Sequence, residues 1–527
     1  MSKKSGSVLD ERLIQLTREG DCLTGRDFAT NVMVWGGTGA GKTSGPAHSA
    51  LRALLQSSSG AGGIVLCAKP SEAEEIRALC AQAGRLDSLI VWNGRNHGFN
   101  FLAYMLARLG SDGINGVTEY FMRVIELIRS ASAMPGDNGD AFWLDALRVL
   151  LRYSLYILYL ATGTVRIAEL MAFVRSAPTS PQQFEDPDWR RDSYFFQCFL
   201  AASGKIDEVS GPRLLAYWKD DFARMDGKLR GNILAGFAML DRFNHGWLQK
   251  ALCCDTTILP ELCFHGAIIV VDTPRATMGE DGIVLQLLWK DAYQTAVLGR
   301  NSLPEIHRKR FVFCYADECQ EVIAHRDAEF LAMSRSSLSS TIYLTQSVPS
   351  IIAKLGGANA RDRAYHLIGN FGIRIFCANA CAETNEFAAR TIGKSLQYRG
   401  GYSQNHGTSS QFGMNVGEGS NWSTNSSFGS NSSHGGTGQS SHGSTSGNGT
   451  SSGGNDSRGR TRGGGSNQGE SWSQNQQMDF VIEPGEFGRM LKTGGPANGN
   501  RVSAIVYQAS RVFKASGGNA VLVEFQQ

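Results

Sequence analysis

Short apolar runs alternate with amphipathic segments over the first hundred residues. Runs of strand length occupy 31–35, 62–66 and 88–93, and leucine and alanine recur at helical spacing over 44–56 and 72–84. Alternation of this kind is typical of a parallel sheet whose strands are joined by crossover helices. We therefore expect the first half of an open α/β core here.

Helical spacing alone marks the middle of the chain. Between about 104 and 258, leucine, alanine and aromatic residues recur at intervals of three and four, and no β-branched run of strand length interrupts them. The periodic segments are 116–131, 141–162, 166–174, 211–225 and 229–243. We expect residues 104–258 to form an all-helical domain inserted into the core.

Runs that resemble strands resume after the helical segment. Short β-branched or aromatic runs lie at 266–274, 310–318, 340–346 and 371–377, and a helical segment follows each of them. We expect residues 259–398 to form the second half of the core, with the strands of both halves joined in one mainly parallel sheet.

A tract rich in Gly, Ser and Asn covers residues 399–477. It offers too little apolar surface to offset the chain entropy lost on folding, so we expect a disordered loop. Apolar runs return at 501–508 and 519–525, after the mixed segment 479–491. We expect 478–527 to return to the core as a last helix and edge strands, which makes the tract an internal loop.

The most specific motif, GGTGAGKTS, directly follows the first strand. It fits the pattern G-x-x-x-x-G-K-[ST], in which glycines let backbone N–H groups converge on phosphate oxygens at a helix N-terminus. A strand precedes it and helical spacing follows it, as that mechanism requires. The predicted nucleotide-binding residues are Gly36, Gly37, Thr38, Gly39, Ala40, Gly41, Lys42, Thr43 and Ser44. Residues 1–103, 259–398 and 478–527 thus make up a predicted nucleotide-binding domain.

The apolar run 311–315 leads, after Ala316, into an acidic pair, Asp317 and Glu318. Hydrolysis of a nucleotide needs a carboxylate for Mg²⁺ and a group that polarises the attacking water. Asp317 suits the first task and Glu318 the second. The alternative interpretation is an acidic helix N-terminus, which the helix dipole favours.

Two further polar residues lie near this pair in the predicted sheet. Gln346 ends the next strand run, where a parallel sheet would set it beside Asp317 and within reach of a γ-phosphate. Arg335 lies between the two runs, and in oligomeric ATPases an arginine presented across a subunit boundary stabilises charge on the transferring phosphate. A solvated arginine explains Arg335 equally well.

Composition adds limits to this picture. With 527 residues and 42% hydrophobic residues the chain can bury a large core, and a net charge of +3 does not by itself indicate nucleic acid. The eleven cysteines lack paired spacing, which favours reduced thiols. We find no signal peptide and no apolar stretch of about twenty residues, so we expect a soluble cytoplasmic protein.

The order of these motifs resembles the TraG/TraD-like coupling ATPases of conjugative type IV secretion, which belong with the RecA-like DNA pumps similar to FtsK and HerA. The segments that carry the resemblance are GGTGAGKTSG, CAKPSE, VWN with FNFL, DAFWLDALRVLL, YADECQ, LTQSVPSI, NFGIRIFCAN and EPGEF. Most members begin with transmembrane helices, for which this sequence has no candidate, so docking at a membrane would need an anchoring partner. Ala68 stands where members usually have an aspartate.

The resemblance implies a RecA-like ATPase core and a homo-hexameric ring. Such a ring would use ATP and Mg²⁺ to move single- or double-stranded DNA, or a relaxase-bound strand, through its centre toward type IV secretion channel proteins. The helical insertion would meet the relaxase or relaxosome complex. Arg335 would act on the nucleotide of a neighbouring subunit, with Arg374 as a weaker second candidate.

The resemblance also implies a role for each residue of the site. Lys42 would reach the β- and γ-phosphates of ATP. Thr43 and Asp317 would bind Mg²⁺, Glu318 would be the general base, and Gln346 would sense the γ-phosphate.

Contacts to DNA are harder to assign from the sequence. The basic clusters at 307–310 and 360–364 could touch phosphate, and each could equally be a solvated loop. The Arg- and Gly-rich stretch 458–465 could bind nucleic acid loosely or act as a spacer. The main alternative function is a ring ATPase that exports or remodels a protein without gripping DNA.

Overall fold

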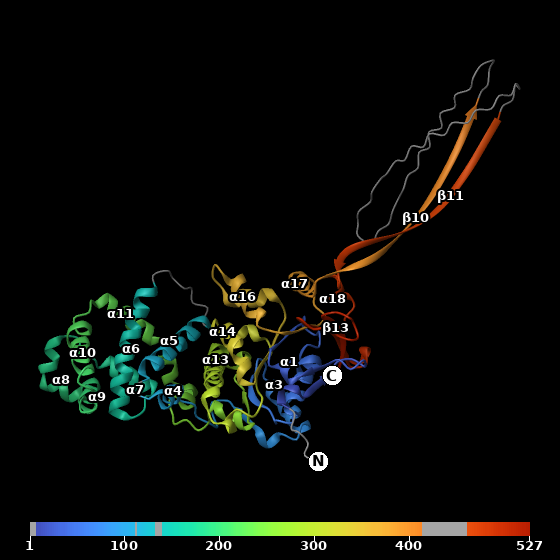
Figure 1. Ribbon diagram of the computed structural model, residues 1–527. Helices are drawn as coiled ribbons and strands as arrows, with labels where there is room; N and C mark the ends of the chain where they lie inside the picture. The colour runs from blue at the N-terminus through green and yellow to red at the C-terminus, as the bar shows by residue number, and fades with distance from the viewer. Residues whose placement is uncertain (1–6, 111–112, 132–139, 414–460) are drawn as a thin grey trace, which may run out of the picture. The chain divides into compact units, whose positions relative to one another are not determined.

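The computed structural model describes residues 7–110, 113–131, 140–413 and 461–527 (Figure 1). The chain divides into two compact units. One contains residues 1–388 and 484–527, and the other contains residues 389–483. The two units are described separately below.

A nine-stranded sheet forms the centre of the first unit. Its order is β13-β12-β9-β3-β8-β7-β4-β6-β5. The strands from β9 to β5 run parallel, and β12 pairs antiparallel with both β9 and β13. Their bounds are β3 Val32–Trp35, β4 Gly62–Leu66, β5 Leu89–Trp92, β6 Ile268–Val271, β7 Val312–Ala316, β8 Ser339–Thr345, β9 Ile373–Phe376, β12 Arg501–Gln508 and β13 Ala520–Gln526. The predicted mainly parallel sheet is confirmed.

The inner strands are buried because helices cover both faces of the sheet. Every residue of β3, β4, β6, β7 and β8 is buried, as expected for a parallel sheet between two helical layers. Helices α2 and α3 pack on one face, while α13, α14 and α15 contact the other. The helices of the core are α2 His48–Leu55, α3 Glu72–Gln82, α13 Arg275–Gly299, α14 Arg326–Ser334, α15 Val348–Leu355, α16 Ala360–Gly369, α17 Ala382–Ile392 and α18 Glu486–Arg489.

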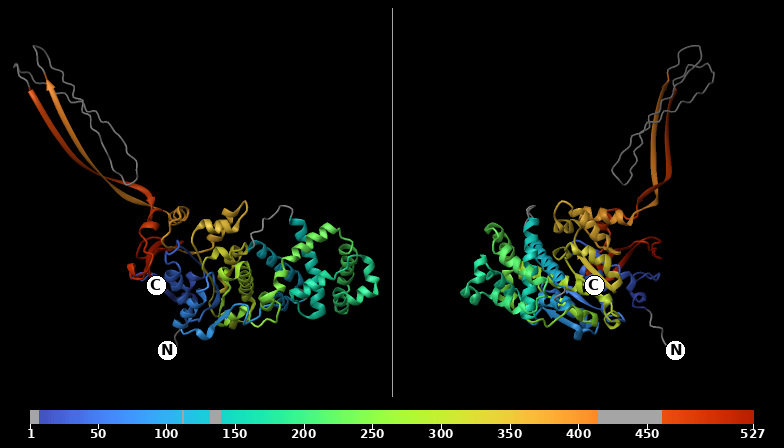
Figure 2. Two further views of the ribbon diagram at one scale, coloured as in Figure 1. Left: turned by 180° about the vertical axis from the view of Figure 1, so that it is seen from behind. Right: turned by 60° about the vertical axis from the view of Figure 1, so that its left-hand side comes forward.

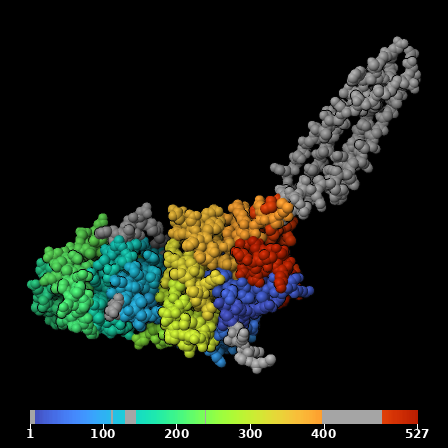
Figure 3. All heavy atoms as spheres, in the orientation of Figure 1, coloured from blue at the N-terminus to red at the C-terminus, as the bar shows by residue number. Residues whose placement is uncertain are grey.

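Helices alone occupy the described residues between β5 and β6. They are α4 Phe101–Leu109, α5 Ile114–Ala131, α6 Asp140–Thr162, α7 Ile167–Arg175, α8 Pro187–Asp192, α9 Tyr194–Ser203, α10 Ser210–Ala216, α11 Gly227–Ala238 and α12 Gly246–Leu252. This confirms the all-helical insertion, although α4 begins before the predicted boundary at 104. Helix α13 contacts both α5 and β4, so the insertion packs directly against the core (Figures 2 and 3).

Among the described residues, no single helix has the length and apolar character to cross a bilayer. One pair of segments, Leu144–Thr162 and Ile167–Arg175, meets the length and composition limits only when it is joined across a bend of 113°.

A short hairpin and one helical turn precede the main sheet in the first unit, and the sequence did not predict them. Strands β1 (Arg12–Gln15) and β2 (Cys22–Thr24) pair antiparallel, and α1 (Gly25–Phe28) follows them. The helix starts with a capping box, in which the side chains of Thr24 and Asp27 bond to each other's backbone N–H. These elements are too short to show the regular spacing of apolar residues from which a strand or helix is predicted.

The second unit contains a long two-stranded ribbon. Strand β10 (Lys394–Gly413) pairs antiparallel with β11 (Thr461–Phe480) along its whole length. The two strands cover both ends of the predicted Gly- and Ser-rich internal loop, residues 399–477. Antiparallel pairing satisfies backbone groups whatever the side chains are, so a composition poor in apolar residues does not exclude it. Residues 414–460, the middle of the predicted loop, lie outside the described residues.

One buried side chain fixes the position of the strand that leads to the phosphate-binding motif. Asn31 precedes β3, is 1% exposed and has a left-handed φ of 66°. Its Oδ1 accepts a hydrogen bond from Thr341 N at 2.9 Å, and its Nδ2 donates to Asn370 O at 3.2 Å. These partners belong to β8 and to the approach to β9, the two neighbours of β3. Asn31 therefore ties three central strands together.

We predict that Asn31→Ala lowers the free energy of unfolding by about 2–4 kcal/mol, because it leaves a buried N–H without a partner and places alanine in the left-handed region. Urea denaturation of the full chain measures the effect. Asn500→Ala is the matched control, since Asn500 also has a positive φ, of 55°, but is exposed. It should lose only about 1 kcal/mol. Equal losses in the two variants would contradict the role of the Asn31 side chain.

Candidate nucleotide-binding site

The glycine-rich motif forms a turn at the carboxyl end of β3. Gly39 and Gly41 have φ values of 75° and 79°, which side chains disfavour. The turn is tied to neighbouring strands, because Gly36 N donates to Thr345 O and Gly37 N donates to Ala378 O. A helical turn, Thr43–Ala47, then leads into α2. The motif therefore has the strand, turn and helix arrangement that phosphate binding requires.

The acidic pair lies at the same edge of the sheet, because β7 is separated from β3 only by β8. The Thr43 hydroxyl donates to Asp317 Oδ2 at 2.8 Å. Lys42 Nζ lies 3.0 Å from Glu318 Oε1 and 3.9 Å from Asp317 Oδ1. The expected meeting of the lysine, the hydroxyl and the two carboxylates is therefore present in the fold.

Glu318 is held in an unusual backbone conformation. It has φ 44° and ψ 48°, the left-handed region in which a residue other than glycine is strained. Its Oε2 accepts a hydrogen bond from Gln320 Nε2 at 2.9 Å, and its Oε1 accepts one from Gln346 Nε2 at 3.3 Å. Gln346 is therefore brought to the acidic pair. Gln320 also contacts the carboxylate, although it was not among the predicted site residues.

Both carboxylates are ionised despite their burial. Burial opposes the charge of Asp317, but the ammonium groups of Lys42 and Lys69 hold its pKa below the ordinary value. For Glu318, burial also opposes the charge, and the hydrogen bond from Gln320 and the charge of Lys42 lower its pKa. The site therefore offers two negative charges and two positive charges at neutral pH.

The donor set fits a magnesium ion and a phosphate chain. Mg²⁺ prefers oxygen ligands and takes only one or two from the protein, with phosphates and water completing its shell. The Thr43 hydroxyl and the Asp317 carboxylate are such oxygens, and they lie beside the turn of the glycine-rich motif. A Cβ at Gly39 would meet no atom within 4 Å, so the tip of the turn is open to a ligand.

Lys69, which lies in the CAKPSE segment, is a further member of this site that was not predicted. It follows β4, which pairs with β7, and its Nζ lies 3.1 Å from Asp317 Oδ2. The sequence contained part of this information, because a lysine that follows an apolar strand lies at the same edge of a parallel sheet as an acid that follows a neighbouring strand. The order of strands across the sheet, which makes them neighbours, was not visible in the sequence.

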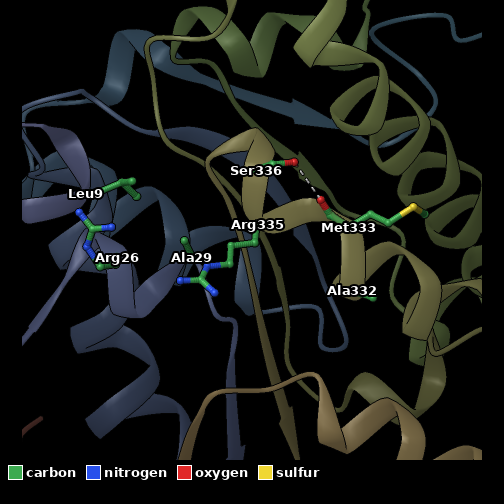
Figure 4. Close-up of a pocket in the computed structure, with 7 residues that line it drawn as sticks. All are labelled: Leu9, Arg26, Ala29, Ala332, Met333, Arg335 and Ser336. Atoms are coloured by element: carbon green, nitrogen blue, oxygen red, sulfur yellow. Dashed lines mark hydrogen bonds between the residues drawn. The ribbon is translucent and has the colours of Figure 1, made fainter. Parts of the chain in front are cut away.

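Arg335 lies at the opposite edge of the sheet. It comes just before β8, whereas Gln346 comes just after that strand. The exposed side chain extends toward Ala29 near α1 (Figure 4). It lines a hollow of about 590 Å³, together with Leu9, Arg26, Ala29, Ala332, Met333 and Ser336. The structure therefore does not bring Arg335 to the glycine-rich turn of its own chain.

The second arginine candidate is engaged inside the core. The Arg374 guanidinium donates to the carbonyls of Phe371 and Ile368 and lies over the rings of Phe387 and Tyr507. These contacts give Arg374 a structural role within its own subunit.

Several arginines of the basic clusters that were considered as DNA contacts bind other groups of the chain. Arg310 donates to the carbonyls of Ser59 and Gly60, and Arg363 donates to that of Leu355. Arg361 lies 3.5 Å from Glu383. Of the third cluster, residues 458–460 and the side chains of 461–465 lie outside what the structure describes.

A scan against protein-family models and a search of curated proteins found no match. Among solved structures, the unbound monoclinic form of the bacterial conjugative coupling protein TrwBdeltaN70 matches with a TM-score of 0.55 and 14% identity, over 98% of this chain and 90% of that one. The chain has the fold of TrwB. The plasmid coupling protein TrwB in complex with the non-hydrolysable GTP analogue GDPNP matches with a TM-score of 0.52 and 14% identity, over 98% and 89% of the chains. The likeness to TrwB confirms the predicted RecA-like core with its helical insertion.

Close to the site of this TrwB-like core, Glu72 is a buried acid with an altered proton affinity. It is 3% exposed, and its Oε2 accepts a hydrogen bond from Ala68 N at 2.8 Å. Burial, helped by the negative charge of Asp317, raises the pKa of Glu72 to about 8 from an ordinary value of 4.5. The folded protein therefore holds this proton more tightly than the unfolded chain, so stability falls as the pH rises between these two values.

We predict that Glu72→Gln removes this loss, because glutamine keeps the acceptor and carries no charge. Melting temperatures of the variant and the wild type, measured from pH 5 to pH 9, should diverge as the pH rises, with the variant more stable at the alkaline end. Glu74→Gln, an exposed change on the same helix, is the control and should follow the wild type. Parallel curves for Glu72→Gln and the wild type would show that Glu72 is ionised in the folded protein.

Proposed function

We propose that this chain is an ATP-hydrolysing coupling protein of a conjugative type IV secretion system. It would deliver DNA, or a relaxase–DNA complex, to the transfer channel. The observation that carries the proposal is the meeting of Lys42 and Thr43 with Asp317 and Glu318 at one edge of a TrwB-like sheet. The motif order that resembles the TraG/TraD-like ATPases supports it, as does the nucleotide analogue bound to TrwB.

In this proposal each side chain has one task on the bound ATP. Lys42 binds the β- and γ-phosphates, and Thr43 and Asp317 hold Mg²⁺, which would neutralise charge on the phosphate oxygens. Glu318 accepts a proton from the attacking water, and its lowered pKa keeps it ionised for that role. Gln346, hydrogen-bonded to Glu318, is positioned to respond to the γ-phosphate.

The proposed assembly is a homo-hexameric ring that encloses DNA, recruited to the membrane by a partner of the secretion channel. Arg335 favours a ring because it lies at the sheet edge opposite its own glycine-rich turn. In a ring, that edge of one subunit can face the nucleotide of the next. Arg335 would then stabilise charge on the phosphate being transferred.

We expect the purified chain to hydrolyse ATP faster in the presence of single- or double-stranded DNA. Lys42→Ala should lower the rate by at least about a hundredfold, because it removes a charge that stabilises the transferring phosphate. Phosphate release measured with and without DNA tests both points. Lys250→Ala, an exposed lysine of the helical insertion, is the control and should keep the wild-type rate.

The same assay separates the proposal from its main alternative. Hydrolysis that ignores both forms of DNA and responds to an added protein substrate would indicate a protein-exporting ring. Hydrolysis that survives in Lys42→Ala would contradict the proposed site itself.

A mixture of two inactive variants tests the arginine across the subunit boundary. Arg335→Ala should bind ATP normally and hydrolyse it poorly, and Lys42→Ala should be inactive. Rings assembled from equal amounts of both should regain activity, because about a quarter of the boundaries pair an intact Lys42 with an intact Arg335. Normal turnover by Arg335→Ala alone, or no recovery in rings shown to be mixed, would remove Arg335 from the site.

A further inference from the structure

Two side chains share one oxygen of the proposed metal-binding carboxylate. Asp317 Oδ2 accepts a hydrogen bond from the Thr43 hydroxyl at 2.8 Å and lies 3.1 Å from Lys69 Nζ. Lys42 Nζ lies nearest to the other oxygen of this carboxylate, Asp317 Oδ1, and to Glu318 Oε1. Lys69 is therefore the cation closest to the oxygen that faces Thr43.

A buried acid holds the turn that presents Lys69. Glu72 Oε2 accepts a hydrogen bond from Ala68 N, and Glu72 N donates to Lys69 O at 3.2 Å. The turn between β4 and α3 is thus fixed on both sides of Lys69. The backbone beside Lys69 is therefore anchored, while its side chain is half exposed.

The two lysines of the site differ in their freedom to move. The Lys42 side chain is 7% exposed, whereas that of Lys69 is 51% exposed. Because a half-exposed ammonium can return to water, the Lys69 contact is the weaker and more easily exchanged of the two. The Asp317 side chain is only 1% exposed, so its charge needs a cation beside it at all times.

A magnesium ion and Lys69 cannot both occupy this position. Mg²⁺ binds carboxylate oxygens at about 2.1 Å, so an ammonium that remained on Oδ2 would lie only about 4 Å from a doubly charged ion. We propose that Lys69 is a displaceable counter-ion of Asp317, which leaves Oδ2 when Mg²⁺ binds and thereby sets the Mg²⁺ concentration that nucleotide binding requires. The inference rests on the proposed ATP site and deepens it.

The test measures binding and not turnover. Binding of a fluorescent, non-hydrolysable ATP analogue to the full chain is measured at increasing MgCl₂ concentrations. The quantity compared is the MgCl₂ concentration at which half of the maximal increase in affinity for the analogue is reached. We expect Lys69→Met to need about three- to tenfold less Mg²⁺ than the wild type, the effect of losing one partly exposed ion pair. Lys69→Arg keeps the charge and should stay near the wild type, and Lys250→Met is the control for an exposed lysine.

Direct metal binding gives a second readout. Mn²⁺, followed by electron paramagnetic resonance in the presence of the same analogue, should bind Lys69→Met more tightly by the same factor. Lys69→Gln provides another neutral side chain, should the thioether disturb the fold. An unchanged or higher metal requirement in both neutral variants, with analogue binding retained, would overturn the inference and leave the ATP site standing. Failure of the wild type to bind the analogue at any Mg²⁺ concentration would overturn both.

Discussion

Charge balance at the carboxyl edge of the sheet is the interaction on which the site depends. Two ammonium groups face two carboxylates there, and the participants are Lys42, Lys69, Asp317 and Glu318. A buried carboxylate without a cation is unstable enough to take up a proton or to open the structure. The same pairing keeps both acids ionised, which is the state that metal binding and proton acceptance need. Stability of the site and its proposed chemistry therefore have one origin.

That balance requires the strands to be in the right order and register. The sequence places the four charged residues on three segments far apart in the chain, and only the order β3-β8-β7-β4 brings them to one edge. Asn31 contributes to the register from the opposite edge, where it ties β3 to its neighbours. The glycine-rich turn also depends on a distant strand, because a Cβ at Gly41 would collide with Val502 of β12. Local motif and global topology are therefore not separable here.

The sequence predicted those features that each arise within a single segment. Apolar runs located the strands of the main sheet, and the glycine-rich motif located the turn after β3. Features that depend on pairing were out of reach. The contact of Lys69 with Asp317 needs the knowledge that β4 neighbours β7, and the left-handed backbone of Glu318 has no residue signature. Strands β10 and β11, at the two ends of the Gly- and Ser-rich tract, pair through backbone groups, so the composition of the tract did not indicate the ribbon.

The insertion is fastened to the core by charge as well as by packing. Asp291 on α13 lies 2.6 Å from Arg326, at the start of α14, and 3.8 Å from Arg123 on α5. One buried carboxylate thus joins a helix of the insertion to the helix that follows the acidic turn. On α13 and α14, Lys290 and Asp327 form a buried ion pair, and Lys290 also donates to the carbonyl of Val322 in that turn. Because buried polar groups must keep their partners, the long helix α13 acts as a shared support for the insertion and for the turn that carries Glu318. The insertion therefore belongs structurally to the site, although none of the proposed catalytic side chains comes from it.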